Sequence, residues 1–246
     1  MKFRILSFLI LLPGFIFAQK DTLVTGLGGL IIHPIYHASM VWEWNDEVVY
    51  FDPHGEPELF EGMPAPTLVL ITHDEAAHFD PKTLNRLKLG QAKLIAPQEV
   101  VDQLGMLRMK FESVTVLNRG EIHDWKDATT IEAVPLYSMN VDAGEPHLSI
   151  GEGNGYIINM GSKRLYISGT AEYIPEMHSV RDIDVAFVPL EAPATIDVGA
   201  PTETLLAFRP KVVYPTQAAQ LDDLQYFTAM IEQEAPEMEV RVREWY

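Results

Sequence analysis

The segment Thr67–Asp80, TLVLITHDEAAHFD, joins an apolar run to a cluster of titratable side chains. Its first part, Thr67–Thr72, is bounded by a proline and a histidine, which predicts a buried strand. His73 and His78 follow directly, with Glu75 between them. In α/β proteins the carboxyl end of a buried strand often carries a functional loop, because the rigid sheet fixes the backbone there. We therefore expect a functional site immediately after this strand.

The rest of the chain alternates short apolar runs with turn residues. Met40–Trp44 and Glu47–Phe51 flank a two-residue polar turn, a pattern that predicts a β-hairpin. The apolar stripe within Leu221–Ile231 has helical spacing and predicts an amphipathic helix. Met238–Trp245 alternates charged and apolar residues, as a half-exposed strand does. Many strands with helices between and after them predict an α/β (α+β) fold with layered, mixed sheets. No internal repeat is visible at a fixed period.

The N-terminal segment Met1–Ala18 has the pattern of a secretory signal. Two cations precede the apolar run Ile5–Leu12, and a small residue ends the segment. A membrane anchor is the alternative, but the run is short and is broken by Pro13 and Gly14, whereas a span needs about 20 apolar residues. We expect a cleaved signal peptide over residues 1–18, a single domain over residues 19–246, and a periplasmic or secreted location.

The charge balance narrows the class of partner. The chain has 18 Lys and Arg against 35 Asp and Glu, a formal net charge of −17. Nucleic-acid backbones and anionic membranes would repel such a chain, so neither is expected as a partner once the signal is removed. We expect a small-molecule substrate or ligand, and the sequence predicts no oligomeric state. Because the chain has no cysteine, any metal ligands must be His, Asp or Glu.

The cluster after the predicted strand has two interpretations. His73, Glu75 and His78 offer two imidazoles and a carboxylate within six residues, a set of donors that suits Zn²⁺. A polar loop whose histidines form local hydrogen bonds has the same pattern. The spacing of the residues leaves both interpretations open.

Several motifs occur in a characteristic order: HAS at 37–39, VVYFDP at 48–53, LVLITHDEAAH at 68–78, RLYISGTAEYIPEM at 164–177 and RPKVVYPTQ at 209–217. In this order they resemble the metallo-β-lactamase-fold hydrolases, specifically the L-ascorbate-6-phosphate-lactonase-like branch. The resemblance covers nearly all of the chain after residue 18. It implies a four-layer αββα sandwich of two mixed β-sheets flanked by helices. It also implies metal-dependent hydrolysis of a small ester, lactone or amide-type substrate.

The resemblance also exposes substitutions at positions where the family binds two metals. The family motif after the strand is His-x-His-x-Asp-His, and Glu75 and Ala77 replace its second histidine and its aspartate. Thr170 stands where a bridging aspartate is expected, and Gln217 replaces the last histidine. Each ligand supplies charge and geometry, and two cations without a bridging anion repel each other. We therefore expect the second metal position to be lost.

The ligand set that the resemblance leaves is His73, Glu75 and His147, a mononuclear site for one Zn²⁺ with an open position. Asp52 is the candidate general base, and His78 is the candidate for orienting groups or shuttling protons. The alternative is a catalytically inactive, metal-free pseudoenzyme that binds a ligand or a protein partner through the old active-site cleft. Both functions stay open at the level of sequence.

Overall fold

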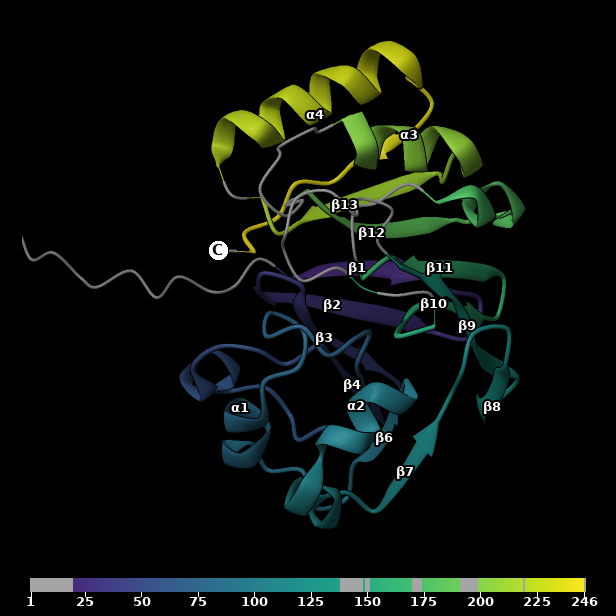
Figure 1. Cartoon of the computed structure of the whole chain (residues 1–246). Helices are drawn as coiled ribbons and strands as arrows, with labels where there is room; N and C mark the ends of the chain where they lie inside the picture. Colours follow the sequence, from purple (N-terminus) through teal and green to yellow (C-terminus); the bar gives the residue numbers. More distant parts are fainter. Residues whose placement is uncertain are drawn as a thin grey trace, which may run out of the picture.

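The computed structural model describes residues 20–137, 148, 151–169, 174–190, 199–218 and 220–245. Within these residues two seven-stranded sheets pack face to face, and helices cover the outer face of each sheet (Figure 1). The predicted four-layer αββα sandwich of mixed sheets is therefore confirmed. The predicted signal peptide, residues 1–18, lies outside the described residues.

The first sheet has the order β1-β2-β3-β4-β5-β6-β7. Its strands are β1 (Asp21–Val24), β2 (Gly29–Tyr36), β3 (Ser39–Trp44), β4 (Glu47–Phe51), β5 (Leu68–Leu70), β6 (Lys93–Ala96) and β7 (Ser113–Val116). The first four strands are antiparallel, and β4 to β7 are parallel. The predicted hairpin is confirmed as β3 and β4, where Trp44 pairs with Glu47 and Asn45 adopts a positive φ of 52°. Tight hairpin turns require this left-handed backbone.

The second sheet has the order β14-β13-β12-β11-β10-β9-β8. Its strands are β8 (Ile122–Lys126), β9 (Thr129–Leu136), β10 (Gly153–Met160), β11 (Lys163–Ile167), β12 (Val185–Pro189), β13 (Val212–Thr216) and β14 (Glu239–Val240). Strands β8 to β11 are antiparallel, and β11 to β14 are parallel. Both sheets thus follow one topology, antiparallel strands first and parallel strands after them. The two sheets share this strand arrangement, although the sequence shows no internal repeat.

Two groups of helices form the outer layers (Figure 1). The first sheet carries η1 (Pro57–Phe60), α1 (Pro81–Arg86), α2 (Gln98–Gln103) and η2 (Gly105–Lys110). The second sheet carries η3 (Pro175–Ser179), α3 (Gly199–Phe208) and α4 (Leu221–Glu234). Leu224, Phe227 and Ile231 of α4 are buried, as the stripe predicts, whereas Leu221 is exposed. None of the helices in the described residues is long and apolar enough to span a bilayer.

The prediction of a strand over Met238–Trp245 is wrong over most of its length. Only Glu239–Val240 pairs, as β14, and the chain beyond it runs without strand geometry. The alternation of residues has another cause. Arg243 reaches Asp21 at 2.6 Å, while Trp245 is buried in the core between the two sheets. The charged residues therefore bind the first strand while the last aromatic ring anchors the segment.

Candidate functional site

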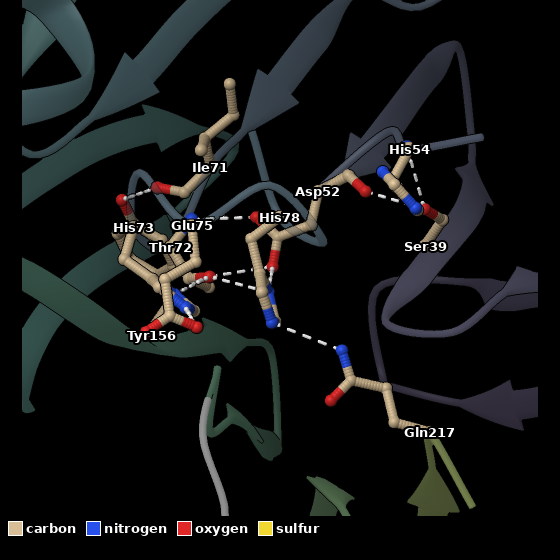
Figure 2. Close-up of polar contacts among 10 residues, drawn as sticks. All are labelled: Ser39, Asp52, His54, Ile71, Thr72, His73, Glu75, His78, Tyr156 and Gln217. Atoms are coloured by element: carbon tan, nitrogen blue, oxygen red, sulfur yellow. Dashed lines mark hydrogen bonds and ion pairs between the residues drawn. The ribbon is translucent and has the colours of Figure 1, made fainter. Parts of the chain in front are cut away.

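Four of the five predicted site residues lie in the segments that follow β4 and β5 (Figure 2). Asp52 directly follows β4, and Thr72 and His73 follow β5 after one further residue. Parallel pairing of the two strands brings these ends together. The backbone N–H of Asn154, at the start of β10, donates to the carbonyl of Thr72 at 2.8 Å. The site is thus fixed to both sheets, as expected for a loop held by rigid strands.

Asp52 is buried, and hydrogen bonds occupy both of its carboxylate oxygens. Oδ1 accepts from the backbone N–H of Thr72 at 2.7 Å. Oδ2 accepts from the Thr72 hydroxyl at 2.7 Å and faces Nδ1 of His78 at 2.8 Å. The Asp52 backbone is left-handed, with φ at 42°, and Ser39 Oγ donates to its carbonyl at 2.6 Å. A buried carboxylate needs such partners, and by accepting their hydrogen bonds Asp52 holds Thr72 and His78 in place.

The hydrogens around Thr72 can be assigned from these contacts. A carboxylate only accepts hydrogen bonds, so the single hydroxyl proton of Thr72 points to Asp52. Nδ1 of His73 lies 2.9 Å from the same hydroxyl oxygen. With the hydroxyl proton already used, His73 must be the donor, and its proton is on Nδ1. Nε2 lies on the other side of the ring, where it contacts Glu75.

The second ring nitrogen of His73 contacts a carboxylate. Nε2 of His73 lies 3.4 Å from Oε2 of Glu75. Burial lowers the pKa of His73, and the neighbouring ring of His78 lowers it further. Contact with His73 lowers the pKa of Glu75, against the opposing effect of burial. An imidazole nitrogen and a carboxylate oxygen, both of which can bind a metal ion, therefore converge here.

His78 is held differently. Its ring lies 4.0 Å from the His73 ring, centroid to centroid, and its Nδ1 faces Asp52. Since Nδ1 donates to that carboxylate, Nε2 accepts, and the side-chain amide nitrogen of Gln217 lies 3.1 Å from it. Gln217 directly follows β13 and has a left-handed backbone, with φ at 51°. Asp52, His78 and Gln217 thus form one hydrogen-bonded chain from the first sheet to the second (Figure 2).

The structure brings together four of the five predicted site residues, Asp52, His73, Glu75 and His78. The fifth, His147, and the substituted position Thr170 lie outside the described residues. Within the described part of the chain, no three His, Asp or Glu side chains form a group arranged to hold a metal ion. The described residues therefore supply two converging metal donors, His73 and Glu75, rather than a complete ligand set.

Two important residues were not predicted as partners within the site. Thr72 contacts Asp52 and both histidines, and the only signal in the sequence is a hydroxyl residue between the strand and His73. Gln217 replaces the last histidine of the family motif, and its bond to His78 spans 139 residues. Its role depends on how the two sheets close on each other.

The match to known proteins extends over most of this fold. A family model described as a beta-lactamase superfamily domain matches residues 32–217. The chain belongs to the beta-lactamase superfamily. The metallo-β-lactamase-fold resemblance of the sequence motifs is thereby confirmed at the level of the family and the fold.

This superfamily member is similar to proteins that bear hydrolase names. A UPF0173 metal-dependent hydrolase of Nanoarchaeum equitans is 24% identical over 182 residues, which cover 73% of this chain and 79% of the relative. A crystal structure from Parabacteroides distasonis, whose designation as a metal-dependent hydrolase is provisional, is 28% identical with a TM-score of 0.79 and covers 94% of this chain and 100% of its own. A metallo hydrolase of Ignicoccus hospitalis shares the fold at 21% identity and a TM-score of 0.69, over 87% of this chain and 95% of its own.

Proposed function

We propose that this protein is a hydrolase with one divalent metal site, bound by His73 and Glu75 and completed by His147. The observation that carries the proposal is the convergence of His73 Nε2 with the Glu75 carboxylate, 3.4 Å apart. The metal-dependent hydrolases among its relatives support it. A bound Zn²⁺ would supply Lewis-acid activation of water, whose pKa then falls to about 7.

The surrounding residues orient these donors. Thr72 accepts the Nδ1 proton of His73 and so holds the ring with Nε2 toward Glu75. Metal-binding histidines usually donate their other N–H in this way, which fixes the ring orientation. Asp52 holds both Thr72 and His78, so we assign it a positioning role in addition to its predicted role as a base. His78 keeps an accepting Nε2 that could take a proton once the Gln217 amide moves aside.

The substrate part of the proposal rests on the resemblance. We propose a small ester, lactone or amide-type substrate, as in the lactonase-like branch, and a protein exported by its N-terminal segment. The test is hydrolysis of a panel of aryl esters and lactones with added Zn²⁺, by wild type, Glu75→Ala and the adjacent control Asp74→Ala. Activity lost only in Glu75→Ala supports the proposal. Activity that survives Glu75→Ala contradicts it.

A second candidate function is the metal-free pseudoenzyme that binds a ligand through the old cleft. The closed chain from Asp52 through His78 to Gln217 favours it, because a neutral amide now satisfies a nitrogen that would otherwise be free to bind metal. Zinc titration with thermal unfolding separates the two functions. Zn²⁺ must raise the unfolding temperature of the hydrolase, since a ligand that binds only the folded state stabilises it. The pseudoenzyme would show no shift.

A further inference from the structure

A second cleft, of about 660 Å³, opens at the edge of the second sheet where β11, β12 and β13 begin. The β10–β11 turn, the segment before β12 and the end of α3 line it. These three strands run parallel, so their carboxyl ends all lie at the opposite edge of the sheet. Gln217 follows one of those carboxyl ends. The cleft is therefore separate from the site around His73.

The lining of this cleft is rich in cations. Five of its residues are basic: Lys163, Arg164, Arg181, Arg209 and Lys211. The whole chain has only 18 Lys and Arg against 35 Asp and Glu, so more than a quarter of its cations surround one hollow. Like charges repel one another, and such a concentration of cations on an acidic protein creates a local positive potential that attracts anions.

The two acidic residues of the lining, Asp182 and Asp184, compensate only part of this charge. Asp184 is buried and lies 3.3 Å from Nζ of Lys163 and 2.7 Å from Nζ of Lys211. Arg209 pairs with Glu237 at 2.7 Å, with both side chains more than half exposed. One carboxylate thus serves two lysines, and an exposed pair of this kind is weak.

Two arginines of the cleft have unused hydrogen-bonding capacity. Arg181 forms no ion pair with any described residue, and its Nη1 donates to the carbonyl of Val180 at 2.7 Å. Nε of Arg164 is buried and has no hydrogen-bond partner among the described residues, although its Nη1 donates to Asn159 at 3.0 Å and its Nη2 lies 3.9 Å from Glu132. Arginine N–H groups left without acceptors are rare and costly when buried. An oxyanion in the cleft would give the exposed guanidinium of Arg181 an acceptor.

The backbone of the lining is also strained. Asp182 and Arg209 have positive φ angles of 56° and 45°. Such angles are uncommon outside glycine, and they persist where the surrounding structure holds them in place. Both residues belong to this cleft, so the strain coincides with the concentration of charge.

We propose that this cleft binds a small multivalent oxyanion, a phosphate group either free or within a phosphate ester, with Arg181 as the main contact. Guanidinium groups suit such a ligand because their planar fork matches phosphate oxygens. Lys163 and Lys211 stay paired with Asp184, so they add to the positive potential in the cleft rather than contact the anion directly. The proposal does not depend on the hydrolase assignment.

The test is isothermal titration calorimetry of the full chain with inorganic pyrophosphate, at an ionic strength held constant with KCl. We expect saturable binding of one ion per chain by wild type, weakened about tenfold or more in Arg181→Ala. The matched control is Arg108→Ala, which removes an exposed arginine of η2 outside the cleft and should leave binding unchanged. Titration with glycerol phosphate then distinguishes an ester from a free ion as the preferred form.

Three outcomes would overturn the proposal. The first is the absence of saturable heat in wild type, and the second is equal weakening in Arg181→Ala and Arg108→Ala. The third comes from Glu75→Ala, which alters the site around His73 only. Binding lost in Glu75→Ala and kept in Arg181→Ala would place the anion at the other site.

Discussion

The Thr72 hydroxyl provides a sharp test of the hydrogen-bond assignment at the site. Thr72→Val keeps the shape of the side chain and removes the one group that contacts Asp52 and both histidines. The side chain is buried, so water cannot replace the lost bonds. Asp52 loses one donor, and Nδ1 of His73 loses its acceptor.

The expected cost follows from these two losses. A hydrogen bond to a charged group contributes about 1.5–3 kcal/mol, and a buried donor left without a partner costs about 1–3 kcal/mol. Burial of the added methyl group offsets part of this, by about 0.8 kcal/mol. We expect Thr72→Val to lower the free energy of unfolding by about 2–5 kcal/mol.

The matched control is Thr129→Val. Thr129 is also buried in a strand, but its hydroxyl has no hydrogen-bond partner among the described residues. Removing that hydroxyl should be neutral or stabilising, because nothing is left unpaired. Urea unfolding followed by tryptophan fluorescence gives both values, and ¹⁵N NMR of the histidines reports the tautomer of His73. Equal effects of the two substitutions, or a His73 without a proton on Nδ1 in wild type, would refute the assignment.

Three further predictions concern other parts of the molecule. Glu75→Ala should weaken zinc affinity about tenfold or more, and Asp74→Ala should leave it unchanged in competition with a chromogenic chelator. Burial raises the pKa of Asp21, but the hydrogen bond from Tyr214 and nearby charges outweigh it and hold the pKa below the ordinary 3.8. Ionised Asp21 therefore stabilises the fold above that pH, and this stabilisation is lost as the pH falls below it. In urea unfolding, Asp21→Asn should lower the stability at pH 7 and reduce the further loss of stability on acidification. Trp245→Ala should cost about 3–5 kcal/mol by the same assay, since the ring is buried between the sheets.

Local sequence patterns correctly predicted the elements whose conformation depends mainly on residues within the element itself. The β3–β4 hairpin and the helix α4 followed from turn residues and periodicity. The segment Met238–Trp245 has the alternation of a strand and yet pairs at only two residues. Its charges contact Asp21, more than 200 residues away. Periodicity carries no information about such distant partners.

The same distinction applies to the site. His73, Glu75 and His78 are neighbours in sequence, so their clustering was predictable, and Asp52 joined them through the family resemblance. The roles of Thr72 and Gln217 were not predictable, because each depends on which groups the folded sheets bring within hydrogen-bonding distance. Proton positions follow only from the complete set of donors and acceptors.

Metal stoichiometry tests the central claim most directly. The protein is purified without chelator or added metal, and inductively coupled plasma mass spectrometry measures the metal bound per chain in wild type and in Glu75→Ala. We predict one equivalent in wild type and loss of that equivalent in Glu75→Ala. Two equivalents in wild type, or one equivalent retained in Glu75→Ala, would contradict a single site held by His73 and Glu75.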